Sequence, residues 1–174
     1  MSFLRLLRAH LDWFSRASKL KFFLTALIEL VALSYGVGMI LQVVFAFPPR
    51  ADLSALSPVA LIVLTTLVSP LVETVLFQFV PIAVVSALGG SRRAQFIAAV
   101  GPFAFAHFVR VDVPTGICAG LIGGAFFAAT YLRWARASDL TAVLLTTALH
   151  SGYNLVGVGL LLTGLAGDVG PAKP

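Results

Sequence analysis

Residues 58–88 read PVALIVLTTLVSPLVETVLFQFVPIAVVSAL, and most of these residues are apolar. Glu73 is the only charged residue in it. A helix that crosses a bilayer needs about 20 apolar residues, so the run is longer than one crossing requires. Pro70 and Pro81 remove backbone donors and predict kinks, or a division into two half-length pieces. The stretch therefore predicts a long, kinked membrane helix.

Four further apolar runs flank this stretch. They cover residues 22–47, 94–109, 116–132 and 140–162, which gives about five spans in total. Hydrophobic residues make up 59% of the chain and charged residues 11%, whereas about 25% of a soluble domain is charged. The sequence therefore predicts an all-α protein, a polytopic transmembrane helical bundle. We expect a single membrane domain over residues 22–162, followed by a tail over residues 163–174.

Basic residues divide unequally between the two ends of the predicted spans. With the N-terminus in the cytoplasm, the inner set comprises Arg5, Arg8, Arg16, Lys19, Lys21, Arg92, Arg93, Arg133 and Arg136, and the outer set comprises Arg50, Arg110 and Lys173. This bias predicts a cytoplasmic N-terminus and an outer C-terminus. We expect an integral membrane protein of a bacterial inner (cytoplasmic) membrane. Because the charges lie at the ends of apolar runs, they do not indicate a nucleic-acid partner.

Residues 1–21 form a separate N-terminal segment. Its apolar helical face comprises Phe3, Leu4, Leu7, Leu11 and Phe14, and its charged face comprises Arg5, Arg8 and Asp12. This pattern predicts an amphipathic helix in the cytoplasmic interface of the membrane. A charged lead-in that only sets the topology is the alternative.

Few ionisable or strongly polar side chains lie inside the predicted spans. They are Glu29, Glu73, Gln78, His107, His150 and Asn154. Ionisable groups are costly in lipid, which makes these residues candidates for function. Glu73 lies about 22 Å along the helix from either end of its run, near mid-bilayer. It is either a general base or a protonated acid that is hydrogen-bonded to a neighbouring helix.

Two pairs of residues at four-residue spacing accompany Glu73. Phe103 precedes His107, and His150 precedes Asn154. Residues four apart share one helical face. Each histidine alone is explained by packing as well as by chemistry. Because separate burial would be costly, we expect both histidines and Asn154 to converge with Glu73 on one polar cavity.

Three motifs on successive spans resemble those of the CPBP family, the CAAX-protease and bacteriocin-processing (Abi) intramembrane endopeptidases. They read Pro70-x-x-Glu73, Phe103-x-x-x-His107 and His150-x-x-x-Asn154, and the resemblance covers roughly residues 58–162 as a protease-like core. It implies a helical bundle with a cavity inside the membrane, where Glu73 activates a water with help from His107. It also implies that His150 and Asn154 stabilise the oxyanion, with Phe77 and Phe103 supporting the site.

The first motif departs from the family pattern at two positions. A second glutamate of the family is Thr74 here, and an arginine four residues later is Gln78. We expect these two side chains to form a neutral hydrogen-bonding pair. Either the substrate differs or catalysis is lost, so a catalytically silent family member acting in bacteriocin immunity or as a scaffold is the alternative. A proton-coupled transporter with Glu73 as carrier is a third hypothesis, which the lack of an internal repeat disfavours.

No cofactor is expected. Glu73, His107 and His150 would suit a zinc site of two histidines and one carboxylate. The sequence lacks a His-Glu-x-x-His helix, however, and a metal-free glutamate mechanism is favoured. The expected partners are the lipid bilayer and a peptide or protein substrate with a membrane-associated segment.

Three minor features remain. A four-residue repeat of small residues predicts close helix packing within the bundle, or a homodimer face, at Gly116, Gly120 and Gly124. Asp139 is expected to cap the last helix. Glu29 has no obvious partner and is expected to play a structural role.

Overall fold

The computed structural model describes residues 3–45 and 57–163, and these residues are almost entirely helical. In chain order the helices are α1 (Phe3–Arg16), α2 (Lys19–Phe45), α3 (Pro58–Val63), α4 (Ser69–Glu73), α5 (Val80–Ala87), α6 (Arg92–Arg110), α7 (Val113–Thr115), α8 (Gly124–Trp134) and α9 (Asp139–Leu162). The described ranges contain no strand, which confirms the all-α class. Arg50, Lys173 and the tail beyond Thr163 lie outside the described residues.

Three segments of π-helix, with i→i+5 hydrogen bonding, join neighbouring α-helices. They are η1 (Leu64–Val68), η2 (Thr74–Phe79) and η3 (Gly116–Gly123). Through η1 and η2, helices α3, α4 and α5 form one helix over Pro58–Ala87. Each of these two π segments ends two residues before a proline, Pro70 or Pro81. Because a proline ring clashes with the carbonyl four residues earlier, a wider turn before it relieves the clash. The predicted long helix is therefore continuous and carries π turns at its prolines.

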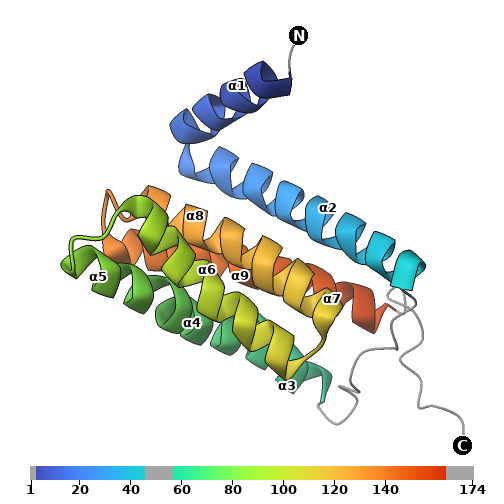
Figure 1. The fold of residues 1–174 in the computed structure, drawn as a ribbon. Helices are drawn as coiled ribbons and strands as arrows, with labels where there is room; N and C mark the ends of the chain where they lie inside the picture. The colour runs from blue at the N-terminus through green and yellow to red at the C-terminus, as the bar shows by residue number, and fades with distance from the viewer. Residues whose placement is uncertain (1–2, 46–56, 164–174) are drawn as a thin grey trace, which may run out of the picture.

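Within residues 3–45 and 57–163, four helical segments are long and apolar enough to cross a membrane. By length and composition these are Lys19–Phe45, Pro58–Ala87, Val113–Trp134 and Asp139–Leu162. The fifth predicted span lies in α6, whose 19 residues begin with Arg92 and Arg93 and are less apolar. In Figure 1, α6 still runs from the α5 end of the bundle to α7 at the opposite end. The helices are thus compatible with an integral membrane protein, with four clear candidate spans.

Serine side chains cap three of the helices. The capping residues are Ser57, Ser91 and Ser138, which accept hydrogen bonds from backbone N–H groups three residues later at 3.2, 3.2 and 3.0 Å. Our prediction that Asp139 caps the last helix is wrong, because Asp139 is the first residue inside α9. Ser138 precedes it with an extended backbone, which directs its hydroxyl oxygen at the N–H of Thr141.

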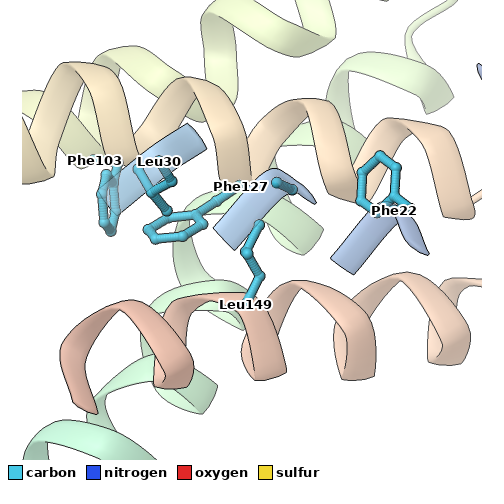
Figure 2. Packing of buried hydrophobic residues seen from close by; sticks show 6 residues of the cluster. Phe22, Leu30, Phe103, Phe127 and Leu149 are labelled. Carbon is cyan, nitrogen blue, oxygen red and sulfur yellow. The ribbon is translucent and has the colours of Figure 1, made fainter. Parts of the chain in front are cut away.

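Side chains from four helices form the core of the bundle. They include Phe22 and Leu30 from α2, Phe103 from α6, Phe127 from α8 and Leu149 from α9, each at most 3% exposed. Figure 2 shows these side chains converging between the helices. The core therefore fixes the distances between α6, α8 and α9. Helices α6 and α9 carry candidate site residues.

The glycine repeat on η3 and α8 faces α6. A Cβ atom added at Gly120 would lie 2.9 Å from Ala104 Cα, and one added at Gly124 would lie 2.9 Å from Phe103 Cδ1. Gly116, Gly120 and Gly124 are all buried. The predicted packing role within the bundle is confirmed, and this face is occupied within one chain.

Helix α1 meets the start of α2 at a sharp turn (Figure 1). The rings of Phe14 and Phe22 lie 4.6 Å apart, and His10 Nε2 lies 3.2 Å from Glu29 Oε1. Our expectation that Glu29 has no partner is therefore wrong, because the turn between α1 and α2 brings His10 to it. Part of the predicted apolar face lies outside the described side chains, namely Phe3, Leu4, Leu7 and Leu11.

Candidate active site

Glu73 lies where an α-helical turn meets a π turn. It is the last residue of α4, and η2 begins at Thr74. Ser69, one turn earlier, donates a hydrogen bond from its hydroxyl to Glu73 Oε1. The Glu73 side chain is 24% exposed. The middle of the long helix therefore presents a carboxylate that is oriented by a neighbour and still accessible.

His150 comes from the middle of α9 and meets this carboxylate. Its Nε2 atom lies 3.8 Å from Glu73 Oε2, and its side chain is 4% exposed. The imidazole stacks on the Phe127 ring at 4.3 Å with an interplanar angle of 24°. The aromatic stack fixes the ring plane, so that Nε2 stays directed at the carboxylate.

His107 reaches the same region from α6. Its Nδ1 atom lies 2.9 Å from the carbonyl oxygen of Phe103. A carbonyl only accepts hydrogen bonds, so Nδ1 carries the proton and Nε2 of a neutral ring keeps its lone pair. The His107 and His150 rings both contact the Phe103 ring. Glu73 and His150 are thus paired between two helices, and His107 on a third helix adjoins the same aromatic ring as His150.

The Phe103 ring separates and aligns the two imidazoles. Its centroid lies 4.4 Å from that of His107 and 5.8 Å from that of His150. Phe77 packs edge-on against it at 5.6 Å. Phe103 therefore contacts both histidines, and Phe77 contacts Phe103.

Asn154 is turned toward the backbone of the long helix. Its Nδ2 atom donates a 2.8 Å hydrogen bond to the Thr65 carbonyl oxygen. That carbonyl lacks a backbone donor: the Ser69 N–H bonds to Leu64 in the π turn, and the next candidate, Pro70, has no N–H. Asn154 therefore braces α9 against η1. The second hydrogen on Nδ2 remains for another acceptor.

The neutral pair that we expected between Thr74 and Gln78 does not form. Both side chains are fully buried, and Thr74 Oγ1 and the two Gln78 amide atoms have no hydrogen-bond partner among the described residues. The physical reason is that η2 begins at Thr74. With i→i+5 turns, residue i+4 no longer lies directly above residue i.

Unpartnered polar atoms also occur on the face of α9 that packs against η2. Thr146 Oγ1 and His150 Nδ1 are buried without a hydrogen-bond partner in the described part of the chain. We call Thr74, Gln78, Thr146 and His150 the polar seam. Buried polar groups nearly always hold a partner. The polar atoms of the seam are therefore exceptions, left without a partner by the described residues.

The geometry bears on the zinc alternative as well. In the part of the chain that the structure describes, no three His, Cys, Asp or Glu side chains gather as a metal-binding group. The donor set of Glu73, His107 and His150 has the right chemistry for zinc, but it is arranged here as a carboxylate–imidazole pair with a nearby second imidazole.

Sequence reasoning missed two residues of this region, Ser69 and Thr146. Ser69 lies four residues before Glu73, and Thr146 lies four residues before His150. The i,i+4 rule could have found both, had hydroxyl side chains been searched on the faces that carry the ionisable groups.

Comparison of the chain with protein-family models, with curated proteins and with solved structures finds no match in any of the three. The resemblance to the CPBP family rests on the motif residues themselves.

Proposed function

We propose that the chain is an intramembrane endopeptidase that hydrolyses a peptide bond of a membrane-associated protein or peptide. The observation that carries this proposal is the pairing of Glu73 with His150, at 3.8 Å, between two long apolar helices. An ionisable pair at mid-helix is costly in lipid and indicates a functional site. His107 and the polar seam beside the pair add the groups that hydrolysis requires.

In the proposed mechanism Glu73 is the general base. Its carboxylate takes a proton from a water molecule, whose oxygen then attacks the carbonyl carbon of the scissile bond. The lone pair on His107 Nε2 accepts a hydrogen bond from the same water and directs it. When the carbon–nitrogen bond breaks, the protonated Glu73 returns the proton to the leaving nitrogen.

His150 is the proposed donor to the oxyanion. In the tautomer that carries its proton on Nε2, the N–H nitrogen lies 3.8 Å from Glu73 Oε2; it is proposed to donate to the carbonyl oxygen once Glu73 has taken the proton of the water and that oxygen has gained negative charge. Removing one such donor typically slows a reaction about 100- to 1000-fold. Asn154 keeps one amide hydrogen on the Thr65 carbonyl and is proposed to donate the second to the oxyanion.

We place the protein in a bacterial inner membrane with a cytoplasmic N-terminus. Two features support this orientation. The turns between α5 and α6 and between α8 and α9 lie at one end of the bundle (Figure 1), and Arg92, Arg93, Arg133 and Arg136 belong to that end. Helix α6, which runs the length of the bundle, is the proposed fifth span, and α1 is the proposed interfacial helix.

A second candidate function is a catalytically silent relative that acts in bacteriocin immunity or as a scaffold. One observation favours it: the Asn154 amide is engaged with the Thr65 carbonyl, which is a bracing contact. Thr74 and Gln78 in place of charged residues fit the same reading.

Comparison of membrane peptides tests the proposal. Cells that carry wild-type protein, Glu73→Gln or Glu29→Gln are compared by mass spectrometry of membrane-associated peptides. Glu29→Gln is the matched control, because it neutralises another intramembrane glutamate, one paired with His10 away from the site. We expect uncut precursor to accumulate only with Glu73→Gln, at wild-type levels of folded protein. Identical peptides and an intact phenotype in all three strains would support the silent relative instead.

A further inference from the structure

A cavity of about 550 Å³ lies at the arginine-rich end of the bundle, away from Glu73. It is formed where α1, α2, α6 and α8 meet. Its lining comprises Phe14, Phe22, Arg92, Ala129, Leu132, Arg133, Trp134, Arg136 and Ala137. We call it the arginine cavity. None of the candidate active-site residues belongs to it.

The polar side chains of the arginine cavity are all hydrogen-bond donors. Three are guanidinium groups and one is the indole N–H of Trp134, and none of these described lining residues carries a carboxylate. Arg133 Nε and Trp134 Nε1 are buried and have no acceptor among the described residues. A guanidinium or an indole N–H cannot accept a hydrogen bond. The complementary ligand is therefore an anion that presents acceptors only.

Two of the arginines are held in place by the backbone. The Arg133 guanidinium lies 4.8 Å from the Phe22 ring centroid and 4.7 Å from that of Trp134. It also donates from Nη2 to the Ala17 carbonyl at 2.8 Å. Arg92 donates from Nη1 to the Leu132 carbonyl at 3.1 Å. The donors are therefore pre-positioned, unlike those of loose surface arginines.

Like charges meet in this cavity. Arg92, Arg133 and Arg136 all line it. An anion bound among these three guanidinium groups would offset their like charges. The carboxylate of Asp139 lines an adjoining cavity with Arg92 and Arg136, and its Oδ1 accepts the Tyr131 hydroxyl at 3.0 Å. Among the described residues Asp139 forms no salt bridge with these arginines, which leaves their charges for an external anion.

The rest of the lining indicates a lipid rather than a free anion. Phe14, Phe22, Ala129, Leu132 and Ala137 are apolar. Basic pockets between membrane helices on the cytoplasmic side suit anionic lipid headgroups. An acyl chain would cover the apolar wall, and the phosphate would meet the arginines.

We propose that the arginine cavity binds the phosphate of an anionic phospholipid, with the lipid lying between α1 and α8. Because Phe14 of α1 forms part of the lining, the bound lipid fastens α1 to the bundle. This inference does not depend on the proposed protease activity.

The test measures retained lipid and thermal stability of the purified full chain. The protein is placed in phosphatidylcholine bilayers with and without phosphatidylglycerol, and bound lipid is counted by native mass spectrometry. We expect retention of phosphatidylglycerol, a raised Tm in its presence, and no effect of added inorganic phosphate. Arg136→Gln should lower phosphatidylglycerol affinity about tenfold, the loss of one charge-assisted contact.

Two further variants keep this test decisive. Arg93→Gln removes a charge from the same end of the bundle without touching the lining, and it should leave phosphatidylglycerol affinity unchanged. Arg92→Gln supplies a second lining substitution, should Arg136→Gln alter folding. Equal weakening by Arg93→Gln, equal retention of phosphatidylcholine, or full replacement of the lipid effect by inorganic phosphate would overturn the proposal.

Discussion

Replacing Gln78 with leucine should stabilise the protein and slow it as an enzyme. The Gln78 side chain is fully buried, and its amide nitrogen and oxygen both lack a hydrogen-bond partner in the described structure. Each buried polar group without a partner costs about 1–3 kcal/mol, so two groups cost about 2–6 kcal/mol. Leucine has a similar size, and its different shape costs up to about 1.5 kcal/mol. We therefore expect Gln78→Leu to raise the free energy of unfolding by about 0.5–6 kcal/mol.

The chain carries its own reporter for this measurement. Cys118 is its single cysteine and its thiol is buried, so a thiol-reactive dye will label it when the bundle opens. Unfolding is followed in micelles for wild type and Gln78→Leu. Cleavage by Gln78→Leu should fall at least about tenfold, because the seam loses a polar partner for water or substrate.

A pair of threonine variants controls this prediction. Thr66 Oγ1 donates to the Ile62 carbonyl at 2.7 Å, whereas Thr74 Oγ1 has no partner in the described chain. Thr74→Val should therefore stabilise by about 1 kcal/mol, and Thr66→Val should not. A Gln78→Leu protein less stable than wild type, or two valine variants with equal stability, would refute the reasoning.

Two further substitutions test the packing. Asn154→Ala should lower the free energy of unfolding by about 1–2 kcal/mol, because it leaves the Thr65 carbonyl unpaired. The loss should be smaller in a Pro70→Ala background, where a backbone N–H becomes available to that carbonyl. Equal losses in both backgrounds would contradict the bracing role. Gly120→Ala should destabilise by about 1–3 kcal/mol, because the new Cβ would lie 2.9 Å from the α6 backbone. Gly36→Ala, with nothing within 4 Å, should be neutral or stabilising. Dye labelling of the cysteine on heating measures all of these.

The helices could be predicted from the sequence because each is a long apolar run with clear ends. Our predicted runs match the observed segments within a few residues, as with Asp139–Leu162 for the last one. The cap at its start was misassigned because Ser138 and Asp139 are adjacent and both cap helices well. Only the backbone conformation of Ser138, which is extended, distinguishes them.

The sequence predicts which residues belong to the candidate site better than it predicts the contacts between them. Burial cost places Glu73, His107 and His150 among the candidates; the structure pairs Glu73 with His150 and sets His107 and His150 against the same Phe103 ring. The π turns could not be read from hydrophobic periodicity, since they depend on how each proline is accommodated. They redirect Asn154 to a carbonyl and separate Thr74 from Gln78.

Contacts across the first turn of the chain escaped the sequence entirely. The pairing of His10 with Glu29 and the arginine cavity both depend on the angle at which α1 leaves α2. Local patterns specify that each segment is helical, but they do not specify where it docks. A glutamate inside the first apolar run is nevertheless a sign that a partner exists, because an unpaired carboxylate is costly there.

A double-mutant cycle between Glu73 and His150 is the most direct test of a shared site. Free energies of unfolding are measured for wild type, Glu73→Gln, His150→Leu and the double variant. We predict a coupling energy of about 1–3 kcal/mol, since the two side chains lie 3.8 Å apart at mid-helix. A parallel cycle between Glu73 and Arg93, at the far end of α6, should be additive within about 0.5 kcal/mol. Additivity in the Glu73–His150 cycle itself would contradict the existence of the site.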